Sequence, residues 1–521
     1  MRYLLSPRYP EAHLFRVVLE LDVPDPAGQV LRLPAWTPGS YMIRDFARHV
    51  VRLAASDDHG PVEVAKRDKQ TWQCAPASGT LRVEYLVHAR DASVRAAALD
   101  ATGGFCNGTS VFLEPRGLAD APCELELDPA GAPAGWRVAT AMPAVEVDAA
   151  GWGRYRAPDY EALVDHPLRF GELHTLRFDV GGVPHEVVFP RRPRVDGDRL
   201  CADLARACAQ HVALFGELPV DRYVFFMNIV GSGYGGLEHR ASTMLDVARD
   251  SLPQPGDAAG REDYVQLLGL CSHEYFHLWN VKRIRPEAFA PPDLGREVHT
   301  EQLWAFEGIT SYYDDLALCR AGLLSQDAWL ERLERLITRV HRGAGRRLQT
   351  LAESSFDAWT RFYKADENAP NAIVSYYAKG ALVALALDLE IRLGTDGQRS
   401  LDDVMRALWH EHGRSGAGVP ERGVERIAEA VSGLDLGEFF DTALRSTRDP
   451  DLAAPLAAFG IRLHWEPPGP AAGFSPHLAL TFGDEGGLPC ARQVLAEGPA
   501  QRAGVAPGDR MVAIEIGRAH V

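Results

Sequence analysis

His273-Glu274-Tyr275-Phe276-His277 is the stretch that decides the fold of this chain. It closes the apolar, helix-compatible run 267–272. Residues four apart share one helix face, so His273 and His277 can hold one Zn²⁺ from the same side. Glu274 can then reach a metal-held water without being a ligand. Zn²⁺ lowers the pKa of such a water to about 7, and a nearby carboxylate can take its proton. The pattern predicts a hydrolytic zinc site, and the alternative is a chance match on a core helix.

A catalytic zinc site needs a third protein ligand and keeps its fourth position for water. The chain has no Cys-x-x-Cys pair, so the third ligand should be a carboxylate or a histidine. Four candidates follow the pentapeptide: Glu297, His299, Glu301 and Glu307. Glu307 is favoured because it lies among Trp304, Phe306 and Ile309. A carboxylate in such a frame is costly to bury unless it is paired or coordinated.

These motifs resemble a known family. The pentapeptide followed by Glu307-Gly308-Ile309-Thr310-Ser311 is similar to the gluzincin metallopeptidases, whose third zinc ligand is the Glu of such a motif. The interval to Glu307 and the tracts 33–41 and 278–286 resemble the glycyl aminopeptidase family, which pairs a gluzincin domain with a C-terminal PDZ domain. The resemblance implies a thermolysin-like catalytic domain with a helical lobe and a Zn²⁺ cofactor.

A glycine-rich motif, Gly235-Gly236-Leu237-Glu238-His239, follows the strand-like run 223–230. Glycines let the backbone approach a ligand, and an edge strand here could take a substrate backbone as an extra strand. In related aminopeptidases the acid of a Gly-x-Met-Glu-Asn motif binds the substrate's α-amine, so the resemblance implies that role for Glu238. Leu237 and His239 depart from that motif. The alternative is an ordinary glycine loop with a solvated glutamate.

A second motif, Tyr377-Ala378-Lys379-Gly380, opens an apolar run. It resembles the Tyr-x-Lys-Gly of gluzincin aminopeptidases, which implies that Tyr377 stabilises the oxyanion. A phenol donor suits that task. Adjacent positions of a helix point about 100° apart, so Tyr376 and Tyr377 cannot both face the zinc. The alternative is a core tyrosine at a helix start.

Some charged residues invite functional assignments that their surroundings do not require. The cluster Lys282, Arg283 and Arg285 is expected to be salt-bridged or solvated, given a net charge of −16. Asp314 and Asp315 either support a zinc ligand or are solvated helix acids.

Composition limits the classes of partner. The acidic balance argues against nucleic acid and anionic membrane surfaces. No apolar run approaches the roughly 20 residues of a membrane span. The eight cysteines are scattered without a disulfide framework, and residues 1–7 lack a signal peptide's apolar core. A cytoplasmic location is the default expectation.

The fold class expected is multidomain α+β. Alternating runs interrupted by Gly and Pro predict an N-terminal antiparallel β domain over residues 1–190. Helical periodicity from Leu200 places the catalytic domain at 191–460, with a small sheet and helices. A linker over 466–473 then precedes a partial, truncated PDZ domain at 474–521, indicated by the similarity of 498–505 and 507–514 to PDZ sequences. The tail 515–521 resembles sequencing-adapter read-through and is expected not to be native.

The function predicted is a zinc aminopeptidase acting on peptides with a free N-terminus. His273, His277 and Glu307 bind zinc, Glu274 is the general base and later acid, Tyr377 stabilises the oxyanion, and Glu238 with Gly235 and Gly236 binds substrate. The resemblance implies a preference for small N-terminal residues such as Gly or Ala, and a peptide C-terminus as a PDZ ligand. The alternatives are an endopeptidase on the same zinc site and a PDZ scaffold or chaperone with a vestigial site.

Overall fold

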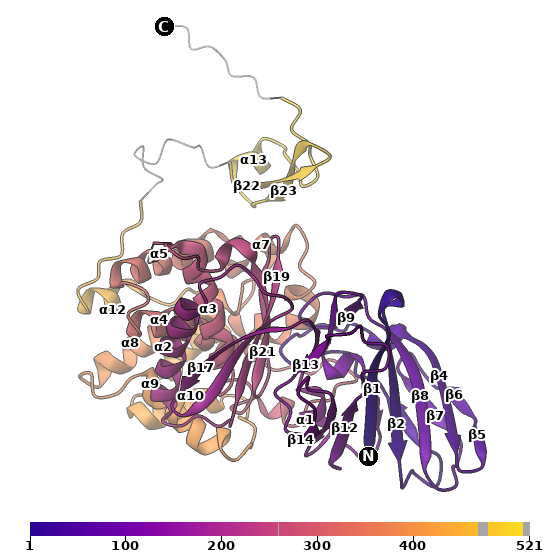
Figure 1. Ribbon diagram of the computed structural model, residues 1–521. Coiled ribbons are helices and arrows are strands. Elements are labelled where there is room, and N and C mark those ends of the chain that lie inside the picture. Colours follow the sequence, from indigo (N-terminus) through magenta and orange to yellow (C-terminus); the bar gives the residue numbers. More distant parts are fainter. Residues whose placement is uncertain (259, 467–477, 514–521) are drawn as a thin grey trace. The chain divides into compact units, whose positions relative to one another are not determined.

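A computed structural model describes residues 1–258, 260–466 and 478–513 (Figure 1). Residues 467–473 of the predicted linker and the tail 515–521 lie outside these ranges. The chain forms two compact units. The first unit contains residues 1–298, 313–329 and 409–420, and the second contains 299–312, 330–408 and 421–521. Each unit is described by itself.

The first unit begins with a large β-sheet in which polar and apolar positions alternate. Every second side chain is buried along β8 (Leu81–His88), as strand periodicity predicts for a sheet with one covered face. The order of the eight strands is β14-β15-β12-β1-β2-β8-β4-β5. The bounds of the other seven are β1 (Arg2–Tyr9), β2 (Leu14–Leu21), β4 (Val50–Asp57), β5 (Gly60–Val62), β12 (Cys123–Leu127), β14 (Ala144–Val147) and β15 (Gly153–Ala157).

One pairing in this sheet departs from the antiparallel prediction. β1 runs parallel to β12, with Arg2 opposite Glu124 and Leu5 opposite Leu127. Parallel neighbours need a long connection, and here about 110 residues of intervening chain supply it. The N-terminal sheet is therefore mixed, because the chain returns to its first strand only after building most of the domain.

Two four-stranded sheets complete the N-terminal region. The first has the order β13-β16-β10-β9 and the second β11-β3-β7-β6. Their bounds are β3 (Val30–Arg32), β6 (Val64–Lys66), β7 (Thr71–Cys74), β9 (Ala97–Asp100), β10 (Gly103–Cys106), β11 (Glu114–Pro115), β13 (Arg137–Ala139) and β16 (Leu168–Gly171). Short helical segments lie between strands of the N-terminal region at η1 (Pro10–Ala12), η2 (Phe46–His49), η3 (Gly108–Ser110) and α1 (Tyr160–Val164).

A five-stranded sheet in the first unit carries the candidate site. Its order is β17-β18-β19-β21-β20, so β20 is an edge strand. The bounds are β17 (His174–Val180), β18 (Val183–Phe189), β19 (Tyr223–Val230), β20 (Tyr234–Glu238) and β21 (Ser242–Ala248). The buried run 223–227 of β19 suits a strand paired in parallel on both sides. β17 and β18 fall within the predicted segment 1–190 but pair into this sheet, and the predicted domain limits remain a proposal.

Helices pack on the five-stranded sheet in the first unit. α2 (Gly197–Phe215) contacts β17, and α3 (Glu262–Phe276) contacts α2, β20 and β21. Asp196 caps α2 by accepting a hydrogen bond from the backbone N–H of Arg199, and Gly216 ends the helix in a left-handed conformation. The remaining short segments of this unit are η4 (Arg249–Ser251), η5 (Glu287–Phe289) and the π-helical turn η9 (Trp409–Gly413).

The second unit is helical apart from a C-terminal hairpin. Its core is α8 (Ala378–Gly394), which is buried on nearly every side and reads as a continuous apolar run. The other segments, some of which begin or end in the first unit, are η6 (Trp304–Gly308), α4 (Ile309–Arg320), α5 (Gln326–Arg342), η7 (Ala344–Arg347), α6 (Leu351–Phe356), η8 (Ala358–Phe362), α7 (Ala369–Ala372), α9 (Leu401–Leu408), α10 (Gly423–Ser432), α11 (Gly437–Arg445) and α12 (Ala453–Ala458).

The described C-terminal residues form a hairpin and a short helix. β22 (Leu480–Glu485) pairs with β23 (Leu488–Val494) across the two-residue turn Gly486-Gly487, where both glycines have positive φ. α13 (Pro499–Arg502) lies within the segment 498–505 that resembles PDZ sequences. A complete PDZ fold is not established by these elements.

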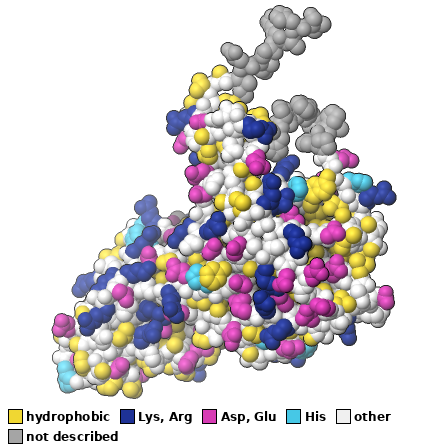
Figure 2. Space-filling view, turned by 180° about the vertical axis from the view of Figure 1, so that it is seen from behind, with side chains coloured by type: hydrophobic (Ala, Val, Ile, Leu, Met, Phe, Trp, Pro, Cys, Tyr) yellow, Lys and Arg dark blue, Asp and Glu magenta, His cyan; other side chains and the backbone are white. Residues whose placement is uncertain are grey.

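Two surface properties bear on the predicted partners. Among the described residues, none of the helices is both long and apolar enough to cross a bilayer. Acidic and basic side chains are interspersed on the face drawn in Figure 2. Mixed charges of this kind avoid large fields of a single sign on that face.

Candidate active site

The pentapeptide lies at the C-terminal end of α3. The helix ends at Phe276, and His277 is its cap residue, with its backbone N–H 3.3 Å from the carbonyl oxygen of His273. The two imidazole rings lie edge to face with centroids 4.7 Å apart. The helix period therefore places both rings on one side, as predicted. The C-terminal end of a helix carries partial negative charge, which favours a cation.

Each imidazole is held in place by a hydrogen-bonding partner at its Nδ1. His273 Nδ1 lies 3.3 Å from Asp314 Oδ2, and His277 Nδ1 lies 2.7 Å from the carbonyl oxygen of Asn280. Such partners fix the ring orientation of a metal-binding histidine and leave Nε2 as the ligand atom. Burial raises the pKa of Asp314, while its hydrogen bond with His273 opposes that shift. Asp314 therefore contacts a predicted zinc ligand and is not a solvated helix acid.

Glu274 is buried beneath the edge strand. The residue is 5% exposed, and its Oε2 lies 3.4 Å from Thr243 Oγ1, whose nearer acceptor is the carbonyl oxygen of Leu237 at 3.0 Å. A Cβ built on Gly236 would lie 2.0 Å from Glu274 Oε1. Glycine at 236 thus lets β20 approach α3 as closely as it does. At Gly235 the nearest atoms to a built Cβ are those of Arg95, 3.9 Å away. Only Gly236 of the two predicted glycines is required by the position of Glu274.

Glu238 lies at the end of β20, with a side chain only 3% exposed. It is not the solvated loop glutamate that the alternative reading describes. Three polar atoms meet here, all within 4.8 Å of one another: a carboxylate oxygen of Glu238, a carboxylate oxygen of Glu274 and a ring nitrogen of His277. Two buried carboxylates that face one place need positive charge there. The structure thus brings Glu238, Glu274 and His277 into one electronegative site.

The N-terminal tract 33–41 reaches this site. Gly39 has φ +91° and a Cβ built on it would lie 2.4 Å from each carboxylate oxygen of Glu238. Both the backbone conformation and the space demand glycine. Trp36 and Tyr41 from the same tract join Phe289 around a cavity of about 50 Å³ that Glu238 also lines. Tyr41 and Phe289 stack with ring centroids 5.6 Å apart, so the walls are rigid aromatic rings.

Asp165 is a supporting residue that the sequence does not reveal. It lies 2.7 Å from Lys282 Nζ, 3.2 Å from His239 Nδ1, and accepts a hydrogen bond from the backbone N–H of Arg240. Burial opposes its ionisation, but Lys282 and His239 hold the pKa of Asp165 well below its usual range. This buried acid ties the segment after Glu238 to the segment after α3.

The side chains of the basic cluster after α3 are bonded within the protein, two of them in ion pairs. Lys282 is 8% exposed and pairs with Asp165, while Arg285 pairs with Glu161. Arg283 donates hydrogen bonds to the carbonyl oxygens of Arg240, Leu278 and Pro219. Their task is to hold the chain around the site.

Glu307 and Tyr377 lie in the second unit. Glu307 is 2% exposed, whereas Glu297 and Glu301 are exposed. A Cβ at Gly308 would lie 2.6 Å from Gly380 Cα, so two glycines let η6 and the start of α8 meet. Burial, followed by the charge of Glu307, raises the pKa of Tyr377 well above its ordinary value, so its phenol stays protonated. Tyr377 is half-buried and its hydroxyl lies 3.4 Å from that of Tyr363.

The two tyrosines of the second motif differ in surroundings. Tyr376 is fully buried and packs on Phe362 with ring centroids 4.7 Å apart. Tyr377 retains exposure, and burial followed by the charge of Glu307 raises its pKa. His299 lies on the exposed surface, stacked on Phe356, with Nδ1 2.9 Å from the carbonyl oxygen of Phe356. His299 is therefore engaged away from the motif residues.

Two family models match the chain. The Peptidase M61 N-terminal domain matches residues 2–172 and the M61 glycyl aminopeptidase model matches residues 266–383. The second range contains the pentapeptide, Glu307 and Tyr377. Among proteins with curated descriptions, none matches the chain significantly.

Solved structures match over most of the chain. The crystal structure of an aminopeptidase N family protein from Idiomarina loihiensis is 39% identical, with a TM-score of 0.94, covering 98% of this chain and 89% of that one. An M1 zinc metallopeptidase from Deinococcus radiodurans is 14% identical, with a TM-score of 0.51, covering 87% of this chain and 95% of that one. A variant of the latter enzyme has been solved with a Tyr-Ser-Ala substrate and has the same TM-score and identity. These distant structures share the fold.

Proposed function

Because the chain belongs to the M61 glycyl aminopeptidase family, we propose that it is a zinc aminopeptidase that removes small N-terminal residues from peptides. One observation carries the proposal: Glu238, Glu274 and His277 offer ligand atoms within 4.8 Å of one another. One carboxylate suits a substrate ammonium group and the other suits proton transfer, beside an imidazole that suits a metal.

The proposed zinc ligands are His273, His277 and Glu307. The donor set fits Zn²⁺, because two imidazoles oriented through Nδ1 and one buried carboxylate leave the fourth position for water or substrate. Glu307 precedes Asp314 by seven residues on the continuous helical run η6–α4. Asp314 on that run contacts His273.

Zinc, when bound, supplies a Lewis acid that polarises the scissile carbonyl and makes water acidic at neutral pH. Glu274 takes the proton of the attacking water and delivers it to the leaving amine. Thr243 and Gly236 hold Glu274 in place for both transfers. The protonated Tyr377 phenol donates a hydrogen bond to the oxyanion, where charge develops in the transition state.

Glu238 makes the enzyme an exopeptidase in this proposal. A substrate backbone that adds to the edge strand β20 brings its N-terminus to the Glu238 end of that strand. A free α-ammonium pairs with the buried carboxylate, whereas an internal or acetylated residue leaves that charge unpaired. This cost disfavours the endopeptidase alternative.

The small cavity beside Glu238 supports the preference for small residues. The α-carbon of a substrate carries both the ammonium group and the first side chain, so that side chain lies next to the amine anchor. The cavity there measures about 50 Å³, far below the roughly 300–1,000 Å³ of common ligand pockets. Glycine or alanine fits, and a leucine side chain would have to displace Trp36, Tyr41 or Phe289.

The C-terminal segment is proposed to be part of a PDZ domain that takes a peptide C-terminus by strand addition. The hairpin β22–β23 and the helix α13 support this proposal. Titration with peptides that differ only in a free or amidated C-terminus would test it, and equal binding of both would contradict it.

The function is tested by hydrolysis of glycyl-, alanyl-, leucyl- and phenylalanyl-arylamides by zinc-loaded protein. The proposal predicts cleavage of the first two at rates at least about 10-fold above the others, a ratio within the range that one or a few methylenes can decide. Glu274→Gln should abolish cleavage. Equal rates across the series would contradict the size preference, and no cleavage by folded, zinc-loaded protein would contradict the enzyme.

A further inference from the structure

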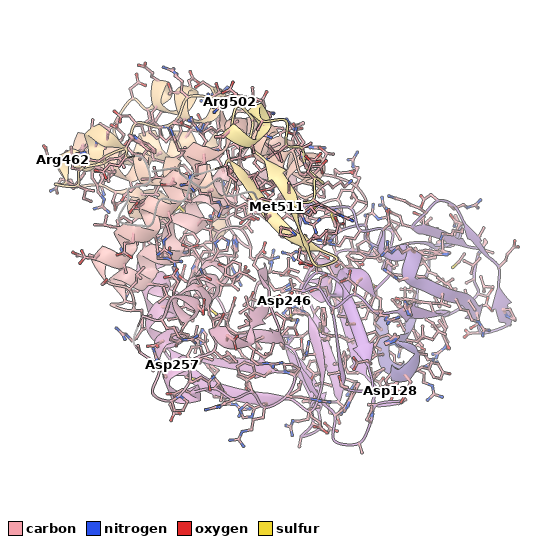
Figure 3. All side chains as sticks on the ribbon, turned by 90° about the horizontal axis from the view of Figure 1, so that it is seen from above. Asp128, Asp246, Asp257, Arg462, Arg502 and Met511 are labelled. Atoms are coloured by element: carbon pink, nitrogen blue, oxygen red, sulfur yellow. The ribbon has the colours of Figure 1, made fainter. Side chains whose placement is uncertain are left out.

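Apart from the small cavity beside Glu238, the first unit has a large depression, lined by residues that the proposed chemistry does not use. It has a volume of about 1,370 Å³, and its walls come from the strand ends 228–230 and 246–250, the segment 190–194 and the N-terminal strands β9 and β10. Seven arginines and four aspartates line it, without a lysine. Asp246 and Asp257, two of these aspartates, are labelled in Figure 3. We call it the arginine groove.

The groove opens on the sheet face opposite the catalytic residues. Thr243 of β21 faces Glu274, and side chains along a strand alternate, so Asp246 faces the other way. Met244 of β21 and Phe226 of β19 face that second side too, in a core with Phe105. The groove is therefore a separate feature and not an extension of the cavity beside Glu238.

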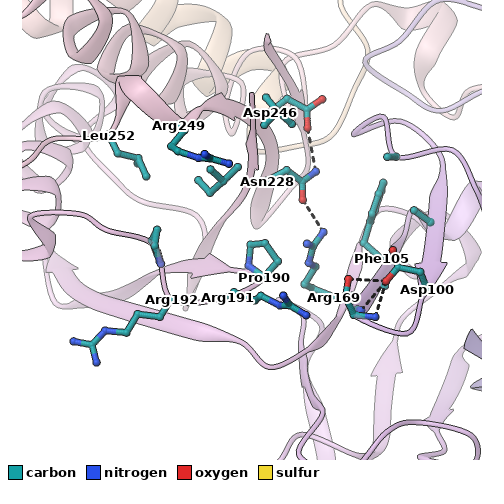
Figure 4. A pocket seen from close by; sticks show the side chains of 18 of the residues that line it. Asp100, Phe105, Arg169, Pro190, Arg191, Arg192, Asn228, Asp246, Arg249 and Leu252 are labelled. Carbon is teal, nitrogen blue, oxygen red and sulfur yellow. Dashed lines mark hydrogen bonds between the residues drawn. The ribbon is translucent and has the colours of Figure 1, made fainter. Parts of the chain in front are cut away.

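The floor of the groove is an ordered polar chain. Arg169 Nη1 donates to Asn228 Oδ1 at 2.6 Å, and Asn228 Nδ2 donates to Asp246 Oδ1 at 3.1 Å (Figure 4). The guanidinium of Arg169 also lies 5.8 Å from the ring centre of Phe105. Figure 4 shows Arg191 and Arg249 beside this chain and Arg192 at its outer margin. These contacts fix the guanidinium of Arg169 at the base of the groove, and other arginines lie around it.

The cations around the rim lack partners of their own. Within the described part of the chain, six of the seven arginines make no ion pair, and Arg169 among them is hydrogen-bonded to Asn228. The other five are Arg90, Arg191, Arg192, Arg194 and Arg249. The seven arginines outnumber the four aspartates of the lining, so the groove carries an excess of positive charge in a chain whose net charge is −16, and an entering anion would offset that excess. Arginine rather than lysine suits carboxylates and phosphates, because the planar fork donates two parallel hydrogen bonds.

The shape and lining favour an extended chain over a compact anion. The volume exceeds the roughly 300–1,000 Å³ of common small-molecule pockets. The arginines come from several segments of the chain, and the partly exposed Ile229 and Pro190 supply apolar surface between them. Asp246 and Asp250 would repel a compact polyphosphate but can accept hydrogen bonds from peptide N–H groups.

We propose that the arginine groove binds an acidic peptide segment, as a recognition site separate from the catalytic centre. The choice of a peptide as the ligand rests on the proposed peptidase function. Carboxylates spaced along the bound segment pair with the rim arginines, and its apolar residues contact the surface between them. Binding is sensitive to salt, because these arginines are exposed.

Binding is tested by calorimetry with Glu274→Gln protein, so that no peptide is cut. The probe is an N-acetylated, C-amidated octapeptide of alternating Glu and Ala, and its matched control replaces every Glu with Gln. Acetylation removes the amine that Glu238 is proposed to hold. The Glu peptide should bind at about 50 mM salt, bind at least 10-fold more weakly at about 300 mM, and bind at least 10-fold more tightly than the Gln peptide.

Charge reversal locates the site. The double variant Arg191→Glu with Arg249→Glu should weaken binding at least 10-fold. The control pair Arg67→Glu with Arg116→Glu changes net charge equally at exposed positions outside the groove and should leave binding unchanged. Equal loss in both pairs, equal binding of the Gln peptide, or no binding at all would overturn the proposal. Tighter binding of inorganic tripolyphosphate, with displacement of the peptide, would reassign the groove to a phosphate-bearing ligand.

The proposal for the groove and the proposed catalytic function can be tested independently of each other. Alanyl-arylamide is too short to span to the opposite sheet face, so the Arg191→Glu, Arg249→Glu variant should hydrolyse it like the parent. Loss of arylamide cleavage in the parent would overturn the proposed function and leave the binding result standing. Loss of peptide binding with intact cleavage would overturn only the groove proposal.

Discussion

Gly39 lies directly against the carboxylate of Glu238, and a methyl group at position 39 would fall 2.4 Å from both of its oxygens. The two residues are almost 200 positions apart, so the N-terminal region forms a wall of the proposed amine-binding site. This contact explains why position 39 of the tract 33–41 is a glycine.

The first prediction concerns this contact. Gly39→Ala should displace the Glu238 carboxylate and raise KM for alanyl-arylamide at least about 10-fold, because a charge-assisted pair with the amine contributes well over 1 kcal/mol. Gly117→Ala is the matched control, since Gly117 also has positive φ (+83°) but open space around a built Cβ. The control should lose about 1 kcal/mol of folding stability and keep its KM. Similar KM values in both variants would contradict the assigned contact.

The second prediction concerns Glu274, the proposed general base. Gly236→Ala should push Glu274 from its position, because the new methyl group would lie 2.0 Å from Oε1. We expect kcat to fall at least about 100-fold, in the range that a positioned proton-transfer group contributes. Gly235→Ala, the adjacent residue with open space, should retain most activity. Steady-state kinetics of the two variants distinguishes this account from one in which any added side chain on β20 inactivates the enzyme.

The third prediction concerns the support of His273. Asp314→Asn should weaken zinc binding by about 10- to 100-fold, the usual effect of removing the partner of a ligating histidine. Competition with a chelator measures the zinc affinity. Asp327→Asn, an exposed acid in the first turn of α5, is the control and should bind zinc like the parent. Unchanged affinity in Asp314→Asn would remove Asp314 from the site.

The fourth prediction separates the neighbouring tyrosines. Tyr377→Phe should lower kcat by about 100- to 1,000-fold with little change in KM, because the hydroxyl acts only on the developing oxyanion. Tyr376→Phe keeps a buried ring and should stay active, with at most a modest loss of stability. Greater loss of kcat in Tyr376→Phe would reverse the assignment.

Local spacing explains why part of the site is predictable from sequence. His273 and His277 share a face because the helix period is fixed, and the structure places both at the end of α3. The amphipathic alternation of β8 is likewise a local property. By contrast, the partners of these residues come from distant segments. Nothing near Asp165 in sequence indicates that it pairs with Lys282, and only tertiary packing brings the two together.

Long-range pairing limited the fold prediction in the same way. Alternation predicts strands but not their neighbours, so the parallel pairing of β1 with β12 escaped it. The arginine groove is a further case. The run Arg191-Arg192-Pro193-Arg194 is visible in the sequence, but Arg90, Arg169 and Arg249 join it only in the fold. The role of Glu238 came from resemblance to a family, and its burial beside Glu274 gives that role a physical basis.

The most direct test of the central claim compares free and N-acetylated alanyl-arylamide as substrates of zinc-loaded protein, with Glu274→Gln and Glu238→Gln as variants. The account predicts cleavage of the free-amine substrate alone, no cleavage by Glu274→Gln, and a KM raised at least about 10-fold by Glu238→Gln. Equal cleavage of both substrates by the parent, unaffected by Glu238→Gln, would contradict it and indicate an endopeptidase.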